Sequence, residues 1–360
     1  MKKATIELLR ELTEANGVPG FEGRVAAIMR AQLRDVADEV CTDGLGSLIA
    51  RLDGAAERPR VMLAAHMDEI GFMAKLVTDE GYVKFANLGG WWDQVLLGQR
   101  VVIETAKGPV RGIIGAKPPH LLSDEDRKKV MAANDMFIDV GAKDRDEACS
   151  ELGIRAGDPI VPWSPFEVLA GGGDRLLGKG WDDRVGVGLA IEVLQAMQGK
   201  QHPNALFAVG TVQEEVGLRG AETSADVVDP DVALVLETGI AGDVPGIKPE
   251  ESHVKLGGGV AIYVLEGSAI PNLRLRNLAI DICEERGLDY QLTILQRGGT
   301  DAGRIHQHAR GVPSLVLGVP CRHIHTHAGV IDARDYDTTL KATLALCEAL
   351  DEQTVASLTD

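Results

Sequence analysis

The sequence predicts an α/β fold, in which a central mixed sheet is covered by helices on both faces and carries an inserted small β-barrel-like domain. Short, nearly all-apolar segments alternate with helical patterns, which is typical of strands buried between two helical layers. From about residue 72 to 165 helical periodicity is almost missing, and short β-like segments are separated by Gly and Pro turn signals. We therefore predict a main α/β domain from residues 1–71 and 166–360, and a β-rich insert from residues 72–165.

The helices and strands of this scheme follow from local periodicity. Helical spacing of apolar residues predicts helices at about 3–15, 22–39, 182–199, 271–287 and 335–351. Apolar runs bounded by turn residues predict strands at 60–72, 205–212, 232–237, 290–295 and 314–319. Within the insert, "YVKFANL", "RVVIETA" and "PVRGIIGA" predict further strands.

Composition and charge exclude several classes of protein. The chain has 360 residues, 45 % of them hydrophobic, and a net charge of -17 with a pI near 5.0. An acidic surface argues against nucleic acid or an anionic membrane as a partner. The first residues have helical spacing without a continuous apolar segment, and no run approaches the roughly 18 apolar residues of a membrane span. Five scattered cysteines are typical of a reducing compartment, so we expect a cytoplasmic protein.

Polar side chains stand where predicted strands end. His66 and Asp68 lie two residues apart near the end of the strand predicted at 60–72. On an extended chain they point to the same side. Asp68 is then placed to hold the far nitrogen of a metal-bound His66. The alternative is a histidine that only caps a strand end.

Two further acidic pairs follow the same pattern. Asp182 and Asp183 precede a helix, where they are either metal ligands or N-caps. Glu214 and Glu215 follow the apolar run "ALFAVGTVQ", although two adjacent carboxylates repel each other and are costly to bury. A metal, an acid/base pair or solvent would account for this pair.

Two later strand ends complete the set. Glu237 ends the strand at 232–237 with a charge, and "CRHIHTHAG" follows the strand at 314–319. His323, His325 and His327 alternate in that segment and would share one face if the chain were extended, unless they are solvated loop histidines.

Together these groups predict a metal site at the carboxyl edge of the sheet, where ligands bind in open α/β folds. Imidazole and carboxylate without thiolate suit Zn, Co or Mn. Two ions about 3.5–4 Å apart need one bridging carboxylate and further end ligands, and the set contains enough groups for both.

Six segments in this order, "HMDEIGF", "WDDRVG", "QEEVGLRGAE", "LETGIAGDVPG", "RGGTDAG" and "RHIHT", resemble the M42 family of metallo-aminopeptidases. These are the tetrahedral or glutamyl aminopeptidases, some of them labelled endoglucanases. The resemblance covers essentially the whole chain. It implies a zinc-peptidase-like fold, hydrolysis of N-terminal residues from peptides by a metal-bridged hydroxide, and two divalent ions per chain, Zn or Co or else Mn. It also implies that the insert serves oligomerisation, in a homo-oligomer between a dimer and a dodecamer.

The resemblance also implies a role for each matching residue. Asp68 would support His66, Asp182 would bridge both ions, and Glu214 would be the general base. The remaining metal ligands would be His66 and Glu237 for the first ion, and Glu215 and His325 for the second. His323 or His327 are alternatives to His325. Gly298, Gly299, Thr300 and Asp301 would line the substrate pocket, or else form only a helix start or tight turn.

Three rival functions are weighed against this one. M20-like metallo-carboxypeptidases or deacylases use similar ligands, but here Asp68 and Asp182 lie 114 positions apart, and the β-rich insert fills that gap. A glycosidase would need opposed carboxylates roughly 5–10 Å apart, which two adjacent glutamates do not easily provide. The third is a non-catalytic assembly protein derived from the same fold.

Overall fold

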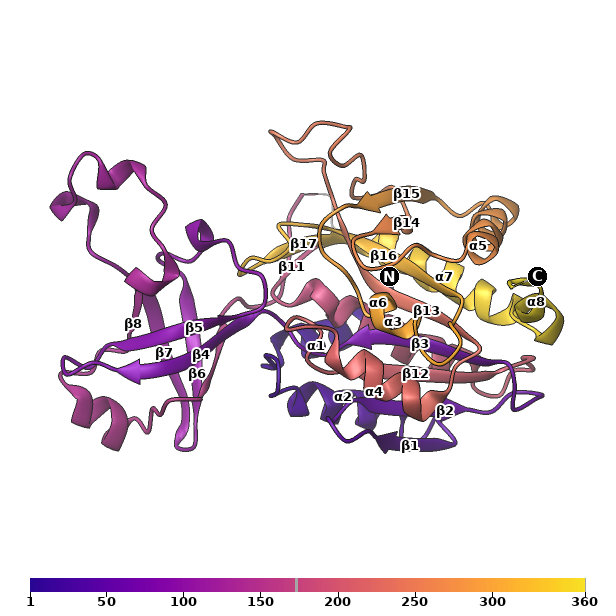
Figure 1. Cartoon of the computed structure of the whole chain (residues 1–360), viewed down its shortest axis with the longest axis horizontal. Helices are drawn as coiled ribbons and strands as arrows, with labels where there is room; N and C mark the ends of the chain where they lie inside the picture. Colours follow the sequence, from indigo (N-terminus) through magenta and orange to yellow (C-terminus); the bar gives the residue numbers. More distant parts are fainter. Residues whose placement is uncertain (172–173, 360) are drawn as a thin grey trace.

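The computed structural model describes residues 1–171 and 174–359. These residues form an 11-stranded mixed sheet flanked by helices, and beside it a closed six-stranded barrel (Figure 1). This architecture confirms the predicted fold class. None of the helices among the described residues has the length and apolar character required to cross a membrane.

The centre of the large sheet consists of four parallel strands in the order β12, β3, β13 and β16. Their bounds are β3 (Arg60–His66), β12 (Ala205–Thr211), β13 (Val232–Ile240) and β16 (Ser314–Arg322). Strands at both sides extend the sheet: β1 (Glu39–Thr42), β2 (Leu48–Leu52), β10 (Glu167–Val168), β11 (Arg175–Gly178), β14 (Val260–Glu266), β15 (Tyr290–Leu295) and β17 (Gly329–Asp332). Because the four central strands run in one direction, their carboxyl ends meet at one edge.

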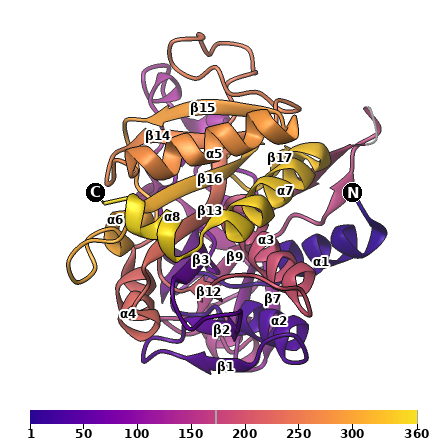
Figure 2. The same cartoon turned by 90° about the vertical axis from the view of Figure 1, so that its right-hand side faces the viewer.

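Helices cover both faces of this sheet. One face packs against α1 (Lys3–Glu14), α2 (Gly23–Leu33), α3 (Trp181–Met197), α5 (Leu273–Arg286) and α7 (Ala333–Ala349), which α8 (Glu352–Ser357) follows. Figure 2 shows α5 and α7 running along the strands of this face. The other face packs against α4 (Arg219–Val228) and α6 (Ala302–Ile305). In β3, Val61 and Leu63 join the first core while Met62 and Ala64 join the second, since successive strand residues point to opposite faces.

The barrel closes in the order β4, β5, β8, β7, β6 and β9, with every pairing antiparallel. Its strands are β4 (Gly71–Val77), β5 (Val83–Leu88), β6 (Arg100–Thr105), β7 (Gly108–Gly115), β8 (Phe137–Asp139) and β9 (Pro159–Pro162). Short turns of helix lie between them and after β8: η1 (Asp93–Val95), η2 (Pro119–Leu121), η3 (Asp126–Lys128), η4 (Ala133–Asp135) and η5 (Glu147–Glu151). The barrel has its own core, which includes Phe72, Val83 and Phe85. The proposed division at residues 72 and 165, and an oligomerising role for the insert, stay predictions.

Several predicted elements differ from the structure in ways that pairing explains. The helix predicted at 22–39 ends at Leu33, because residues 39–42 pair with β2. The strand predicted at 60–72 stops at His66, and the barrel begins at Gly71. The strand predicted at 232–237 continues to Ile240, since β13 stays in register with β16 as far as Cys321. Local patterns missed β1, β2, β4, β8, β9, β10, β11, β14 and β17, as well as α4, α6 and α8.

Candidate active site

The candidate active site lies at the carboxyl edge of the four parallel strands. His66 ends β3 and pairs in register with Thr211, the last residue of β12. Two of the site segments follow a strand end directly, one after β12 and one after β16, while Glu237 lies within β13 and Asp182 in the first turn of α3. The fold therefore brings together His66, Asp182, Glu214, Glu215, Glu237 and His325, which are far apart in the sequence.

Two groups of possible metal ligands share the carboxylate of Asp182. One group is His66, Asp182 and Glu237, the other is Asp182, Glu215 and His325, and within each group the ligand atoms lie within 4.8 Å of one another. Asp182 Oδ1 is 3.0 Å from His66 Nε2, and Asp182 Oδ2 is 3.1 Å from His325 Nε2. Each oxygen of Asp182 thus faces a different group, which is the arrangement of a carboxylate that bridges two ions.

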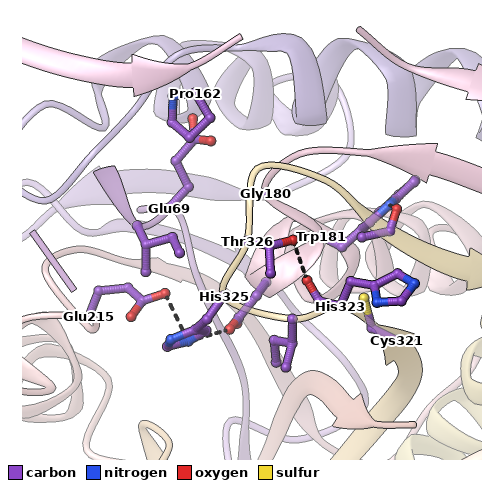
Figure 3. A pocket seen from close by; sticks show the side chains of 13 residues that line it. Glu69, Pro162, Gly180, Trp181, Glu215, Cys321, His323, His325 and Thr326 are labelled. Atoms are coloured by element: carbon purple, nitrogen blue, oxygen red, sulfur yellow. Dashed lines mark hydrogen bonds and ion pairs between the residues drawn. The ribbon is translucent and has the colours of Figure 1, made fainter. Parts of the chain in front are cut away.

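The chemistry of these donors fits two divalent cations. Glu237 Oε2 lies 3.8 Å from His66 Nε2, and Glu215 Oε1 lies 3.6 Å from His325 Nε2 (Figure 3). Glu215 Oε1 is buried and has no hydrogen-bond partner among residues 1–171 and 174–359. Imidazole nitrogens and carboxylate oxygens are the donors that Zn, Co and Mn accept in catalytic sites.

Burial dominates the electrostatics of the site. It raises the pKa of Glu214 and of Glu237 well above the usual range, and it raises the pKa of Glu215 to about 8, with Asp182 adding to this last shift. Burial lowers the pKa of the His325 imidazole, but the hydrogen bond to Asp182 and the negative charges of Glu215 and Asp182 together outweigh it and raise that pKa to about 10. Such crowding of carboxylates is costly unless a positive charge lies among them.

Asp68 holds the site through both its main chain and its side chain. The closest partner of His66 Nδ1 is the main-chain carbonyl of Asp68 at 2.9 Å, whereas the Asp68 carboxylate lies 3.7 Å away. The carboxylate instead accepts the main-chain N–H groups of Glu214 and Glu215, each at 3.0 Å. The sequence predicted that the Asp68 side chain orients His66; in the structure its main-chain oxygen lies nearer, and its side chain fixes the two glutamates.

The backbone turns sharply to bring two adjacent glutamates to one site. After β12 ends at Thr211, Gln213 takes a left-handed conformation with φ +57°, and Gly217 follows with φ +130°. The N–H of Gln213 donates to Glu22 Oε1 at 3.0 Å, which ties this turn to the start of α2. No sequence pattern indicated a role for Glu22, because nothing local links it to a turn 191 positions away.

The sequence left two roles open for Asp182 and Asp183, metal ligand and N-cap, and the structure separates the two residues. Asp183 is fully buried, and its carboxylate accepts the N–H of Gly186 at 3.0 Å and the N–H of His66 at 3.1 Å. It therefore caps the first turn of α3 and holds the end of β3 at the same time. Asp182 faces the imidazoles, as described above.

The three histidines after β16 do not share a face. His323 and His325 have left-handed backbones, with φ +61° and +56°, so the segment is not extended. His325 joins the second ligand group, whereas the His323 ring points away from Glu215 (Figure 3). His327 is buried against Trp91 with ring centroids 5.0 Å apart, and its ring nitrogens have no partner in the described part of the chain. Burial lowers the pKa of His327 to about 4.

A cavity of about 500 Å³ opens beside the two ligand groups. Gly298, Gly299 and Thr300 line it, but Asp301 does not. Asp301 is only 1 % exposed, starts α6 and accepts a hydrogen bond from the Thr211 hydroxyl, so its carboxylate points into the protein. For Asp301 the structure fits the alternative that the sequence left open, a helix start, rather than a place in the cavity wall. The cavity also has walls that the sequence did not indicate: Leu218, Ile240, Tyr263, Leu295, Arg297 and Ile324.

Comparison with known proteins identifies the family of the chain. The profile of the family described as M42 glutamyl aminopeptidase matches residues 46–342. The chain is 48 % identical to the TET aminopeptidase of the marine sediment archaeon Thaumarchaeota archaeon SCGC AB-539-E09, over 99 % of both chains, with a TM-score of 0.96. It is 33 % identical to the TET1 peptidase of Pyrococcus horikoshii, which can assemble into a tetrahedron or a large octahedral shell, over 96 % of this chain and 100 % of that one, with a TM-score of 0.86.

A further relative is also an aminopeptidase. The chain is 35 % identical over 351 residues to the lysyl aminopeptidase of Pyrococcus furiosus, covering 96 % of this chain and 97 % of the relative. Family profile, sequence identity and fold agree along nearly the whole length. The chain therefore belongs to the M42 family of aminopeptidases, hydrolases that remove N-terminal residues from peptides.

Proposed function

We propose that this aminopeptidase works with two divalent metal ions, which His66, Asp182 and Glu237 would hold on one side and Asp182, Glu215 and His325 on the other. The observation that carries this proposal is the position of the Asp182 carboxylate, with one oxygen 3.0 Å from His66 and the other 3.1 Å from His325. When bound, such ions polarise the scissile carbonyl and lower the pKa of the attacking water. Zn or Co suits these donors best, and Mn is also compatible.

Glu214 is the general base in this proposal. It belongs to neither ligand group, yet it lines the cavity, and its Oε2 lies 4.0 Å from His66 Nε2. Glu214 takes a proton from the water whose oxygen forms the new bond to the carbonyl carbon. It then gives that proton to the amine that leaves as the C–N bond breaks. One glutamate of the pair thus moves a proton while its neighbour Glu215 binds metal.

The cavity holds the N-terminal residue of the peptide. Leu218, Ile240 and Leu295 supply apolar walls, and Arg297 adds a cation to the lining. This volume is sufficient for a single side chain next to the reacting carbonyl. An aminopeptidase is supported over an M20-like carboxypeptidase because the family match spans the inserted barrel as well as the ligand segments.

The subunits assemble into a closed homo-oligomer in this proposal. The relative from Pyrococcus horikoshii can form a tetrahedron, and a tetrahedral shell of identical asymmetric subunits contains twelve copies. The barrel stands beside the catalytic domain, where its surface is available for contacts between copies (Figure 1).

The test compares Glu214→Gln with Glu222→Gln, since Glu222 lies exposed on α4 away from the site. Glu214→Gln should lower kcat on aminoacyl-anilides by about 10²–10⁴-fold and still bind two ions per chain, because only the proton carrier is lost. Glu222→Gln should match the wild type. Metal content is measured by mass spectrometry, and a chelator should abolish activity until Zn or Co is restored. Loss of metal from Glu214→Gln would show that Glu214 is a ligand, and hydrolysis that survives the chelator would exclude metal catalysis.

A further inference from the structure

The second ligand group depends on a segment of the barrel. His325 lies in a loop rather than in a strand, and its ring is oriented by the main-chain carbonyl of Gly90, which accepts a hydrogen bond from Nδ1 at 2.8 Å. Gly90 follows β5 and is 235 positions away in the sequence. His66 differs, because its Nδ1 contacts the main-chain carbonyl of Asp68, which is only two positions away in the sequence.

This contact determines which nitrogen of His325 is available for a metal. A neutral imidazole carries one N–H and one lone pair, and the N–H lies on Nδ1 when Nδ1 donates to a carbonyl. Nε2, which is 3.1 Å from Asp182 Oδ2, then has its lone pair free for an ion. Partners of this kind fix the ring orientation and tautomer of metal-binding histidines.

Trp91 anchors the segment to the barrel and to the loop that carries His325. Its ring stacks on Phe72 of the barrel core, with centroids 4.8 Å apart and planes at 18°, and its Nε1–H donates to the Gly71 carbonyl at 2.9 Å. Trp91 also packs against His327, with ring centroids 5.0 Å apart, and His327 lies two residues after His325. Trp91 thus joins the barrel to the loop that carries the ligand.

A side chain at either glycine of this segment would crowd its neighbours, Ile70 and Glu215 at Gly89 and His325 at Gly90. A methyl group added at Gly90 would lie 3.1 Å from His325 Nδ1, and one added at Gly89 would lie 3.1 Å from Glu215 Oε2. Gly89 also has φ +83°, which favours glycine. The backbone of this segment therefore contacts His325 through the Gly90 carbonyl and runs close to Glu215 at Gly89.

We infer that Gly89, Gly90 and Trp91 form a positioning segment through which the barrel shapes the second metal site. Gly90 also lines the cavity, but the segment acts on the metal site through His325 and Glu215. The barrel is then part of the metal centre as well as a separate folding unit. The inference rests on the proposed two-ion function and assigns the segment to one ion of the two.

The test measures binding of Zn or Co to the full-length protein, by calorimetry and by metal content after dialysis at graded ion concentrations. Gly90→Ala should weaken the affinity for one ion by about 10–100-fold and leave the other unchanged, because the methyl group displaces only His325. Trp91→Ala should weaken the same ion, and Trp91→Phe should restore part of the loss, since it keeps the stack on Phe72. The matched control is Trp92→Ala, because Trp92 is 62 % exposed and should bind both ions as the wild type does.

Two results would overturn the inference. One is a Gly90→Ala protein that retains both wild-type affinities. The other is a Gly90→Ala protein in which both affinities fall equally, since that indicates a general loss of structure. A wild-type protein that binds no ions would refute the proposed function itself. If the wild type binds two ions and Gly90→Ala gives either of these two results, only this inference is refuted.

Discussion

At the scale of single residues, the adjacent glutamates 214 and 215 have separate surroundings. Glu215 lies 3.6 Å from His325, while Glu214 lies 4.0 Å from His66 on the other side of Asp182. Both depend on the carboxylate of Asp68, whose two oxygens each accept one of their main-chain N–H groups. A single buried side chain therefore sets the positions of the proposed base and of one proposed ligand.

Replacing Asp68 by Asn should damage both functions of this turn. An amide offers one oxygen, so one of the two N–H groups loses its acceptor and faces an NH₂ group instead. An unpaired buried donor costs about 1–3 kcal/mol, and we expect kcat to fall by about 10–100-fold as the glutamates shift. Thermal unfolding and steady-state kinetics measure the two effects.

The control for Asp68→Asn is Asp226→Asn, because Asp226 is an exposed acid on α4. It should change neither quantity. Wild-type kinetics in Asp68→Asn would show that the two hydrogen bonds do not position the catalytic glutamates.

At the scale of elements, the site depends on how closely α3 approaches β13. Gly186 lies in the first turns of α3, and a methyl group there would overlap the Leu236 carbonyl and the Asp183 carboxylate. The missing side chain lets the helix pack directly against the backbone of the strand that carries Glu237. This close approach places Asp182 over the sheet edge, where it meets His66.

Gly186→Ala should therefore destabilise the protein by about 1–3 kcal/mol or more, because the added atom overlaps backbone that cannot move freely. Gly23→Ala is the matched control: it begins α2, and an added methyl group meets nothing within 4 Å. That substitution should be neutral or stabilising by up to about 1 kcal/mol, since alanine restricts the unfolded chain. Urea unfolding of both variants measures the difference. Equal stabilities would mean that α3 and β13 do not pack as tightly as the structure indicates.

At the scale of the whole molecule, the barrel projects beside the catalytic domain (Figure 1). The connection between β7 and β8 extends from it and carries exposed apolar residues, with Leu121 65 % and Val130 53 % exposed. Exposed apolar side chains at the end of a projecting segment are typical of contacts between subunits. Of the two adjacent tryptophans, Trp91 packs inside the barrel and Trp92 faces outward.

If the chain forms the proposed homo-oligomer through this connection, Leu121→Glu should reduce its size, because a charge at a buried contact between copies is costly. Light scattering after size-exclusion chromatography measures the particle mass. Val227→Glu is the control, since Val227 is also exposed but lies on α4 of the catalytic domain. An unchanged mass for Leu121→Glu would exclude this connection from the contacts that hold the assembly together.

The sequence predicted the fold class and the residue types of the site, because both depend on local patterns. Alternating apolar segments marked the central strands, and the acidic and imidazole groups stood near their ends. Edge strands such as β1 escaped detection, since only pairing with β2 makes them strands. The shared face that an extended chain would give the three histidines after β16 does not form, because left-handed residues at 323 and 325 break the alternation.

The sequence by itself determined which chemical groups this protein brings to its site and at which edge of the sheet they gather, since strand direction and residue type are encoded locally. Only the tertiary structure decided how each group is held. The Asp68 side chain supports the glutamates, Glu22 supports Gln213, and the Gly90 carbonyl orients His325. These contacts join residues that are 146 to 235 positions apart, and main-chain carbonyls and N–H groups are present at nearly every position. No local pattern distinguishes the few that the fold brings to the metal ligands.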